Sequence, residues 1–135
     1  MASIHKEFRI EARPEVVWAA ARDVGAVHLR LAQGFVVDTR LDGDARIVTF
    51  ANGQVAREPI VDIDDRTRRL VWAAVGGRLS HYNASLQIFA EGESASRAVW
   101  IVDLLPNDLR EAIGAMVELG SAAIKRTLEE ASAAG

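Results

Sequence analysis

LREAIGAMVELGSAAIKRTL, residues 109–128, is the stretch that decides how this chain folds. Apolar and small side chains return along it at intervals of three and four, a spacing that places them on one face of an α-helix. The stripe consists of Leu109, Ile113, Met116, Val117, Gly120, Ile124 and Leu128. Charged residues fall mostly outside this stripe. The stretch therefore predicts a long C-terminal helix that covers another layer of the structure with its apolar face.

Upstream of this helix, the sequence pattern predicts strands separated by tight turns. Seven strands are expected, at residues 4–10, 35–41, 46–50, 54–63, 70–75, 80–90 and 97–105. Asn52-Gly53 is the strongest hairpin signal, and Pro59 predicts an edge position or a bulge in its strand. Between the first two strands, Pro14 opens a short helix and residues 27–31 form a second one.

The order of these elements predicts an α+β fold. Strands in hairpin succession form an antiparallel sheet, and such a sheet needs a cover on one face. We expect a seven-stranded curved sheet around the long C-terminal helix, with two short helices after the first strand. Residues 1–135 would form a single domain, with residues 131–135 as a frayed tail. A cavity can remain where the sheet curves around the helix.

Composition excludes several classes of function. The chain has 135 residues and a net charge of -3, which gives no electrostatic reason to bind nucleic acid or an anionic membrane. It has no cysteine, so we expect no disulfide and no cysteine nucleophile, which suits a cytoplasmic protein. No apolar run approaches the roughly 18 residues that a membrane-spanning helix needs, so membrane insertion is not expected.

Signals for metals and cofactors are missing as well. His5, His28 and His81 are scattered along the chain, so no metal site is expected. Phosphate-binding and dinucleotide-binding fingerprints are absent, and we expect no cofactor. The expected partner is a small hydrophobic or aromatic molecule, and the sequence leaves open whether the chain is a monomer or a homodimer.

Three passages resemble the superfamily of START, Bet v 1 and polyketide cyclase or dehydrase proteins, also called SRPBCC. ARPEVVW at 12–18 resembles its opening helix, DIDDRTRRLVW at 62–72 its central hairpin, and VWIVDLLP at 99–106 its last strand. The resemblance covers nearly the whole chain and implies a helix-grip fold. The superfamily includes lipid carriers, receptors, cyclases and co-chaperones, so the function has to be argued from the site.

Strand alternation selects residues that could line the cavity. In residues 80–90 the apolar set contains Tyr82 and Leu86, and Trp72 is expected to face the helix by the same reasoning. Both faces of the last strand are apolar, and there the resemblance favours an inward Trp100. These three aromatic residues would form an aromatic wall or, alternatively, an ordinary core.

On the long helix, Met116 and Gly120 are candidates for the floor of the cavity. Close packing of the helix on the sheet is the alternative.

Three polar residues are further candidates. Glu58, next to Pro59, could be turned inward by a bulge and would then need a partner, or it could be a solvated strand residue. Asp103 could act as a general acid or base, or as a turn carboxylate before Pro106. His28 could act as a base near the pocket mouth, or be a half-exposed helix residue. Arg46 is expected at the surface, beside the turn at residues 42–44.

We derive three hypotheses for the function. The leading one is binding or carriage of a small hydrophobic or aromatic molecule in an internal cavity. The second is a cyclase or dehydratase that holds a flexible chain in one shape while Tyr82, Asp103 or His28 moves protons. The third is a co-chaperone-like interaction module with an exposed apolar patch.

Overall fold

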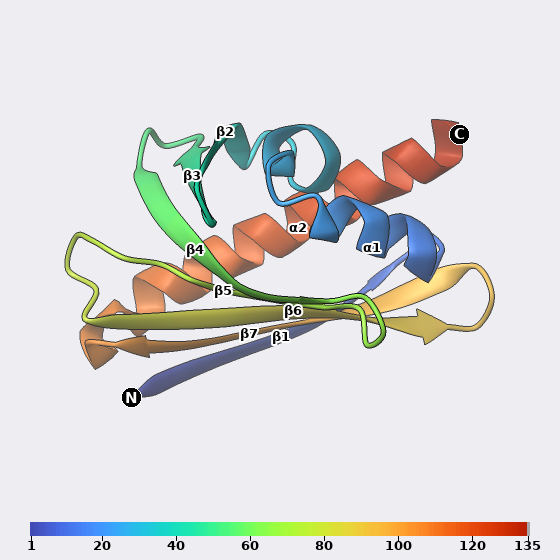
Figure 1. Ribbon diagram of the computed structural model, residues 1–135. Coiled ribbons are helices and arrows are strands. Elements are labelled where there is room, and N and C mark those ends of the chain that lie inside the picture. Colours follow the sequence, from blue (N-terminus) through green and yellow to red (C-terminus); the bar gives the residue numbers. More distant parts are fainter. Residues whose placement is uncertain (135) are drawn as a thin grey trace.

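The computed structural model describes residues 1–134. Seven strands, two short helical segments, one medium helix and one long helix follow each other along the chain (Figure 1). They are β1 (Ala2–Ile10), α1 (Pro14–Arg22), η1 (Val27–Leu31), β2 (Val36–Asp42), β3 (Ala45–Phe50), β4 (Val55–Asp64), β5 (Arg69–Ala73), β6 (His81–Glu91), β7 (Ala95–Leu105), η2 (Asn107–Leu109) and α2 (Arg110–Ala134). The π-helical segment η1 is the second short helix expected after the first strand.

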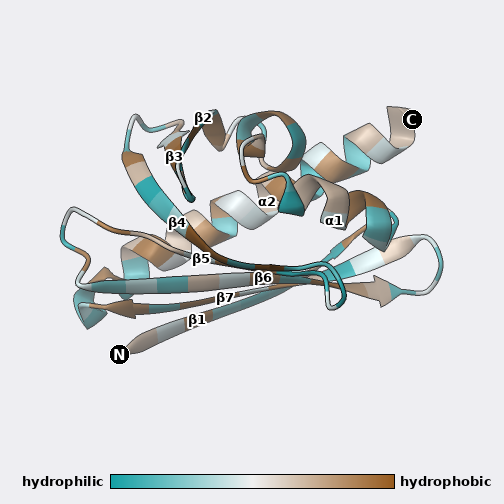
Figure 2. Ribbon diagram, viewed as in Figure 1, coloured by the Kyte–Doolittle hydropathy of each residue, from teal (hydrophilic) through white to brown (hydrophobic). Residues whose placement is uncertain are grey.

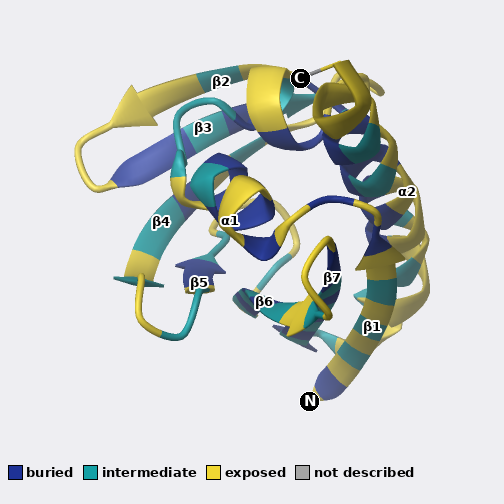
Figure 3. Cartoon of the chain, turned by 90° about the vertical axis from the view of Figure 1, so that its right-hand side faces the viewer, coloured by how far each residue is buried: buried dark blue, intermediate teal, exposed yellow. Residues whose placement is uncertain are grey.

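The seven strands form one antiparallel sheet in the order β1-β7-β6-β5-β4-β3-β2. Figure 3 shows the strands as an arc that runs from β2 to β1, with α2 beside β1 on the open side of the arc. The sequence-based fold, a curved antiparallel sheet around a long C-terminal helix, is confirmed. Within residues 1–134, no helix combines the length and the apolar character needed to cross a bilayer.

Alternation along the strands produces the buried face of the sheet. Ala84, Leu86 and Ile88 of β6 are buried against the helix side, as their spacing of two predicts. In α2, hydrophobic and hydrophilic residues follow each other along the ribbon, as expected of a helix with one buried face (Figure 2). Val117 and Ile124 lie in that buried stripe.

The structure decides between the two predictions for Pro59, an edge position or a bulge. Pro59 does not lie on an edge strand, because β4 has β3 on one side and β5 on the other. The missing N–H of the proline is tolerated because the pairing of β4 with β5 begins only at Ile60. The register of this pairing shifts between Ile60 and Asp62, which is the bulge or irregularity that Pro59 predicts. The helix α2 continues through Ala134 with alanine, the best helix former, so residues 131–134 of the expected frayed tail are helical in the structure. Gly135 lies outside the described residues.

The first helix is attached to the sheet by one carboxylate. The indole Nε1 of Trp18 donates to Oδ1 of Asp65 at 2.9 Å, and Nε of Arg22 donates to the same oxygen at 2.7 Å. Asp65 lies in the turn between β4 and β5, so α1 is held against that end of the sheet. Hydrogen bonds from Arg22 and Trp18 keep the pKa of Asp65 below its ordinary value.

The long helix approaches the sheet most tightly at Gly120. A Cβ atom at this position would lie 2.9 Å from Cη2 of Trp100 on β7 and 3.1 Å from Cε2 of Phe35, which precedes β2. Both distances are well inside van der Waals contact. Packing therefore requires glycine at position 120. Of the two predictions for Gly120, cavity floor or close packing of the helix on the sheet, close packing applies at this contact.

We expect Gly120→Ala to lower the free energy of unfolding by about 1–2 kcal/mol, because overpacking against two rings outweighs the gain of about 1 kcal/mol in helix propensity. Gly114→Ala is the matched control, since its Cβ would meet only Cδ1 of Ile4, at 3.9 Å. It should raise the free energy of unfolding by up to about 1 kcal/mol. Urea denaturation of both variants tests this, and equal stabilisation of the two would show that α2 does not press on the sheet at Gly120.

Candidate functional site

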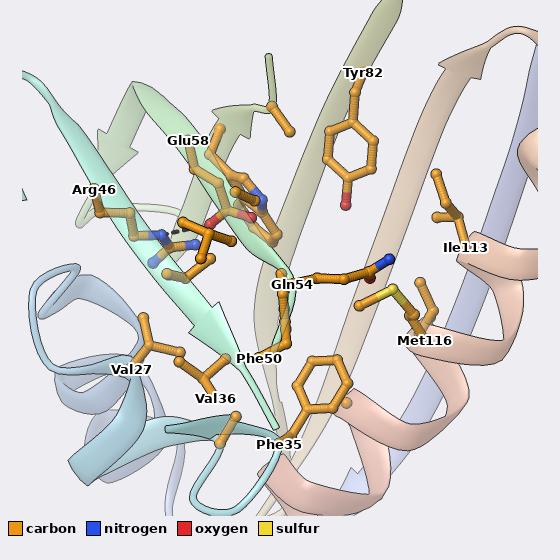
Figure 4. Close-up of a pocket in the computed structure, with 18 of the residues that line it drawn as sticks. Val27, Phe35, Val36, Arg46, Phe50, Gln54, Glu58, Tyr82, Ile113 and Met116 are labelled. Atoms are coloured by element: carbon orange, nitrogen blue, oxygen red, sulfur yellow. Dashed lines mark hydrogen bonds and ion pairs between the residues drawn. The ribbon is translucent and has the colours of Figure 1, made fainter. Parts of the chain in front are cut away.

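A cavity of about 540 Å³ lies between α2 and the concave face of the sheet. It is lined by side chains from strands β3 to β7, from the segment around η1, and from α2 (Figure 4). Apolar residues dominate this lining, and they include Val27, Val36, Val48, Leu70, Leu86, Ile113, Met116, Val117 and Ile124. The volume of the cavity and its apolar lining are typical of sites that bind small molecules.

Aromatic rings form much of the wall. The ring centroids of Trp72 and Trp100 lie 6.2 Å apart with planes tilted by 48°. Phe35 and Phe50 meet edge to face at 5.3 Å. Flat, polarisable surfaces of this kind suit flat apolar ligands.

The mouth of the cavity is marked by lining residues that are exposed to solvent. Val55, Val75 and Arg78 are exposed: Val55 begins β4 directly after the β3–β4 turn, and the other two lie in the β5–β6 loop. Figure 1 shows both connections at the same end of the molecule as the start of α2. Arg78 pairs with Asp108 at 2.9 Å, which joins the β5–β6 loop to the segment that precedes α2.

One buried ion pair interrupts the apolar wall. Arg46 of β3 and Glu58 of β4 are direct neighbours in the antiparallel ladder, and both side chains point to the inner face of the sheet (Figure 4). Nε of Arg46 donates to Oε1 of Glu58 at 2.8 Å, and the residues are only 4% and 7% exposed. The guanidinium carbon also lies 5.2 Å from the ring centroid of Trp72.

Three buried N–H donors in and around this ion pair make no hydrogen bond. Nη1 of Arg46 and the indole nitrogens of Trp72 and Trp100 are buried without a hydrogen-bond partner among the described residues. An unpaired buried donor costs about 1–3 kcal/mol, so these groups are notable in a folded core. All three are donors.

Burial raises the pKa values of the two titratable groups Glu58 and Tyr82 in the cavity wall. Withdrawal from water raises the pKa of Glu58 above its ordinary value, although Arg46 opposes the rise. The nearby Trp72 indole also opposes it without reaching hydrogen-bond geometry in the structure. Burial and the charge of Glu58 likewise raise the pKa of Tyr82, so its hydroxyl stays protonated and can donate. Figure 4 shows that this hydroxyl points into the cavity.

Most residues selected from the sequence lie together around the cavity. They are Glu58, Trp72, Tyr82, Leu86, Trp100, Met116 and Gly120. The alternation of β6 and β5 placed Tyr82, Leu86 and Trp72 correctly on the inner face. Their roles in binding remain predictions.

His28 and Asp103 were candidates for proton transfer at the pocket, with a half-exposed helix residue and a turn carboxylate as the alternatives, and the structure places both outside the cavity lining. On β7 the residues Trp100, Val102 and Leu104 are buried on the inner face, so the intervening Asp103 lies on the outer face, opposite Asn83 and Ser3.

His28 does not line the cavity, because η1 turns it toward β2. There its Nδ1 lies 3.0 Å from Oγ1 of Thr39.

Sequence reasoning missed Arg46, Phe35 and Phe50 as cavity residues. Arg46 was expected at the surface, and it is instead the buried partner of Glu58. Arg57, the neighbour of Glu58 in the sequence, is exposed and pairs with Asp42 at 3.5 Å. The available signal was alternation, since Arg46, Val48 and Phe50 share one face of β3.

A sheet curved around one long helix, with an apolar cavity between them, defines the helix-grip class of small-molecule-binding folds. The chain belongs to the polyketide cyclase / dehydrase and lipid transport family, whose model matches residues 1–134. Among curated protein sequences, none matches this chain.

Solved structures share the fold at low sequence identity. An uncharacterised protein from Bacillus thuringiensis superposes with a TM-score of 0.83 at 14% identity, covering 94% of this chain and 98% of its own. A START superfamily protein from Mycobacterium smegmatis gives 0.73 at 14% identity, with 95% and 97% coverage. Norcoclaurine synthase from Thalictrum flavum, in complex with dopamine and hydroxybenzaldehyde, gives 0.70 at 18% identity, with 96% and 87% coverage.

The raised pKa of Glu58 makes a prediction about pH. A carboxyl group with a raised pKa in the folded state stabilises the fold most below its ordinary value of 4.5, and this contribution is lost as pH rises through the folded-state pKa. We therefore expect the stability of the protein, measured relative to Glu58→Gln, to decline as the pH rises from 4.5 into the neutral range. Denaturant titrations of both proteins across this range measure the difference. A difference that grows with pH would show that Arg46 lowers the pKa of Glu58 more than burial raises it.

Proposed function

We propose that this protein binds and carries a small, predominantly apolar aromatic molecule in the cavity between α2 and the sheet. The cavity itself carries the proposal, because its volume of about 540 Å³ falls in the range of small-molecule sites and its wall is aromatic and aliphatic. We place this activity in the cytoplasm.

The comparisons support this proposal at the level of class. The family description includes lipid transport, which is carriage of an apolar molecule. The norcoclaurine synthase structure of similar fold holds dopamine and hydroxybenzaldehyde, two small aromatic molecules. In this chain Trp72, Trp100 and Phe50 would supply the corresponding aromatic contacts.

A panel of flavonoids, fatty acids, sterols and aromatic polyketides tests the proposal by isothermal titration and thermal melting. We expect saturable binding of at least one class, with a stabilisation of about 2.7 kcal/mol when the ligand is at 100 times its Kd. Met116→Trp should weaken this binding at least about tenfold by filling the cavity. Leu119→Trp is the matched control, because Leu119 is exposed on the same helix and does not line the cavity.

Two results would contradict the proposal. An absence of binding across the whole panel would indicate a cavity that closes in solution, and it would favour the interaction-module hypothesis. Equal affinity in both tryptophan variants would place the bound molecule outside this cavity.

A cyclase or dehydratase activity is the second candidate, and one observation favours it. Glu58 and Tyr82 belong to the same cavity and lie close enough for the charge of Glu58 to raise the pKa of Tyr82. A carboxyl group and a protonated hydroxyl are groups that general acid and base catalysis uses. Glu58 thereby takes the place that His28 and Asp103 were expected to fill.

Turnover of a short poly-β-ketone ester, followed by mass spectrometry, tests this second candidate. Tyr82→Phe should reduce the rate by about 100-fold if the hydroxyl transfers a proton, whereas Asp103→Asn on the outer face should leave it unchanged. Identical rates in Tyr82→Phe and the unaltered protein would remove Tyr82 from the mechanism. Denaturation curves of both variants show whether the fold is intact.

A further inference from the structure

Arg46, Glu58 and Tyr82 form the polar end of the cavity, and their chemistry indicates which polar group a ligand carries. Arg46 is more than nine-tenths buried, lines the cavity, and makes a single hydrogen bond, from Nε to Glu58. Its terminal amino groups make none within residues 1–134, and Nη1 is fully enclosed by protein. A guanidinium group has five N–H donors, so most of its capacity is unused.

Donors dominate this end of the cavity. The Tyr82 hydroxyl points into the cavity, and its high pKa keeps the proton on the oxygen. No hydrogen bond from this hydroxyl to another described residue is present. The complementary group on a ligand is an oxygen with lone pairs, because such an oxygen can accept a hydrogen bond from a hydroxyl such as that of Tyr82 and from a guanidinium such as that of Arg46.

Charge restricts the kind of oxygen further. At a pH above the raised pKa of Glu58, its carboxylate neutralises Arg46 at a distance of 2.8 Å, so the pair presents almost no net charge to the cavity. A carboxylate ligand would bring a second negative charge beside Glu58, in surroundings where charges are poorly solvated. A carbonyl oxygen brings two lone pairs and no charge.

Resting on the proposed binding function, we infer that Arg46 and Tyr82 recognise the carbonyl oxygen of a neutral aromatic ligand, and that Glu58 excludes carboxylates of the same shape. Arg46 and Tyr82 are thus specificity-determining residues. Glu58 orients the guanidinium through Nε and leaves Nη2 for the ligand, since Nη1 is enclosed by protein.

Three ligands of nearly equal shape test this inference by isothermal titration. They are 2-acetylnaphthalene, 2-isopropenylnaphthalene, which replaces the carbonyl oxygen with a methylene group, and 2-naphthoate, which carries a carboxylate. We expect 2-acetylnaphthalene to bind at least about tenfold more tightly than either of the other two. This ranking needs no variant, so it remains informative if substitutions in the buried pair prevent folding.

Substitutions then assign the preference to residues. Tyr82→Phe should reduce the affinity for 2-acetylnaphthalene about fivefold and leave 2-isopropenylnaphthalene unchanged. The double variant Arg46→Met with Glu58→Met, which leaves no unpaired buried charge, should bind both ligands equally. Arg57→Met is the matched control, since Arg57 is exposed beside Glu58 and pairs with Asp42. It should keep the ranking of the unaltered protein.

The outcomes separate the inference from the function on which it rests. Equal affinity for 2-acetylnaphthalene and 2-isopropenylnaphthalene would overturn carbonyl recognition while leaving a binding cavity in place. Tightest binding of 2-naphthoate would also overturn it, by showing that the polar end accepts an anion. Failure of all three ligands, together with failure of the wider panel, would overturn the proposed binding function itself.

Discussion

The contact of α2 with both ends of the curved sheet is the constraint on which the rest of this structure depends. At Gly120 the helix backbone lies against Trp100 on β7 and against Phe35 just before β2. Trp100 lies on the strand next to β1 at one end of the arc and Phe35 lies beside β2 at the other end, so their common contact with α2 limits how far the sheet opens. Toward its N-terminus α2 follows β1 and leaves space over the central strands. The cavity is this space.

The buried ion pair has no evident purpose in stability alone. Replacement of such a pair by apolar side chains of similar volume is often neutral or stabilising, because removing two charges from water is costly. Arg46 and Glu58 nevertheless occupy the inner face of the two strands that form the far wall of the cavity. A ligand could accept hydrogen bonds from the unused donor groups of Arg46, and the near-zero total charge of the pair would favour a neutral ligand. The position of Arg46 and Glu58 on the cavity wall and their hydrogen-bonding chemistry therefore both indicate contact with a ligand.

The fold could be predicted from the sequence because its two strongest patterns agree. The apolar stripe in residues 109–128 requires a surface to cover, and the hairpin succession before it supplies that surface. Alternation in β6 also placed Tyr82 and Leu86 correctly. On β7 alternation alone could not assign a face to the candidate Asp103, since both faces are apolar, and the structure places it on the outer face.

The ion pair could not be predicted because it depends on the length of one turn. A two-residue turn at Asn52-Gly53 would place Arg46 opposite Pro59. The turn is one residue longer: Phe50 N–H donates to the carbonyl of Gln54, with Gly53 at a positive φ of 88°. That additional residue moves the register by one and places Arg46 opposite Glu58. Sequence patterns rarely determine a turn to one residue, so a site built across a hairpin requires the structure.

The three tryptophans provide the most direct test of the central claim that the interior binds a ligand. Trp72 and Trp100 line the cavity, whereas Trp18 lies outside it with its indole N–H bound to Asp65. Two-dimensional NMR resolves the three indole N–H resonances during a titration with 2-acetylnaphthalene. We expect saturable shifts of the Trp72 and Trp100 resonances while the Trp18 resonance stays in place. Unchanged Trp72 and Trp100 resonances at ligand saturation would contradict an internal binding site.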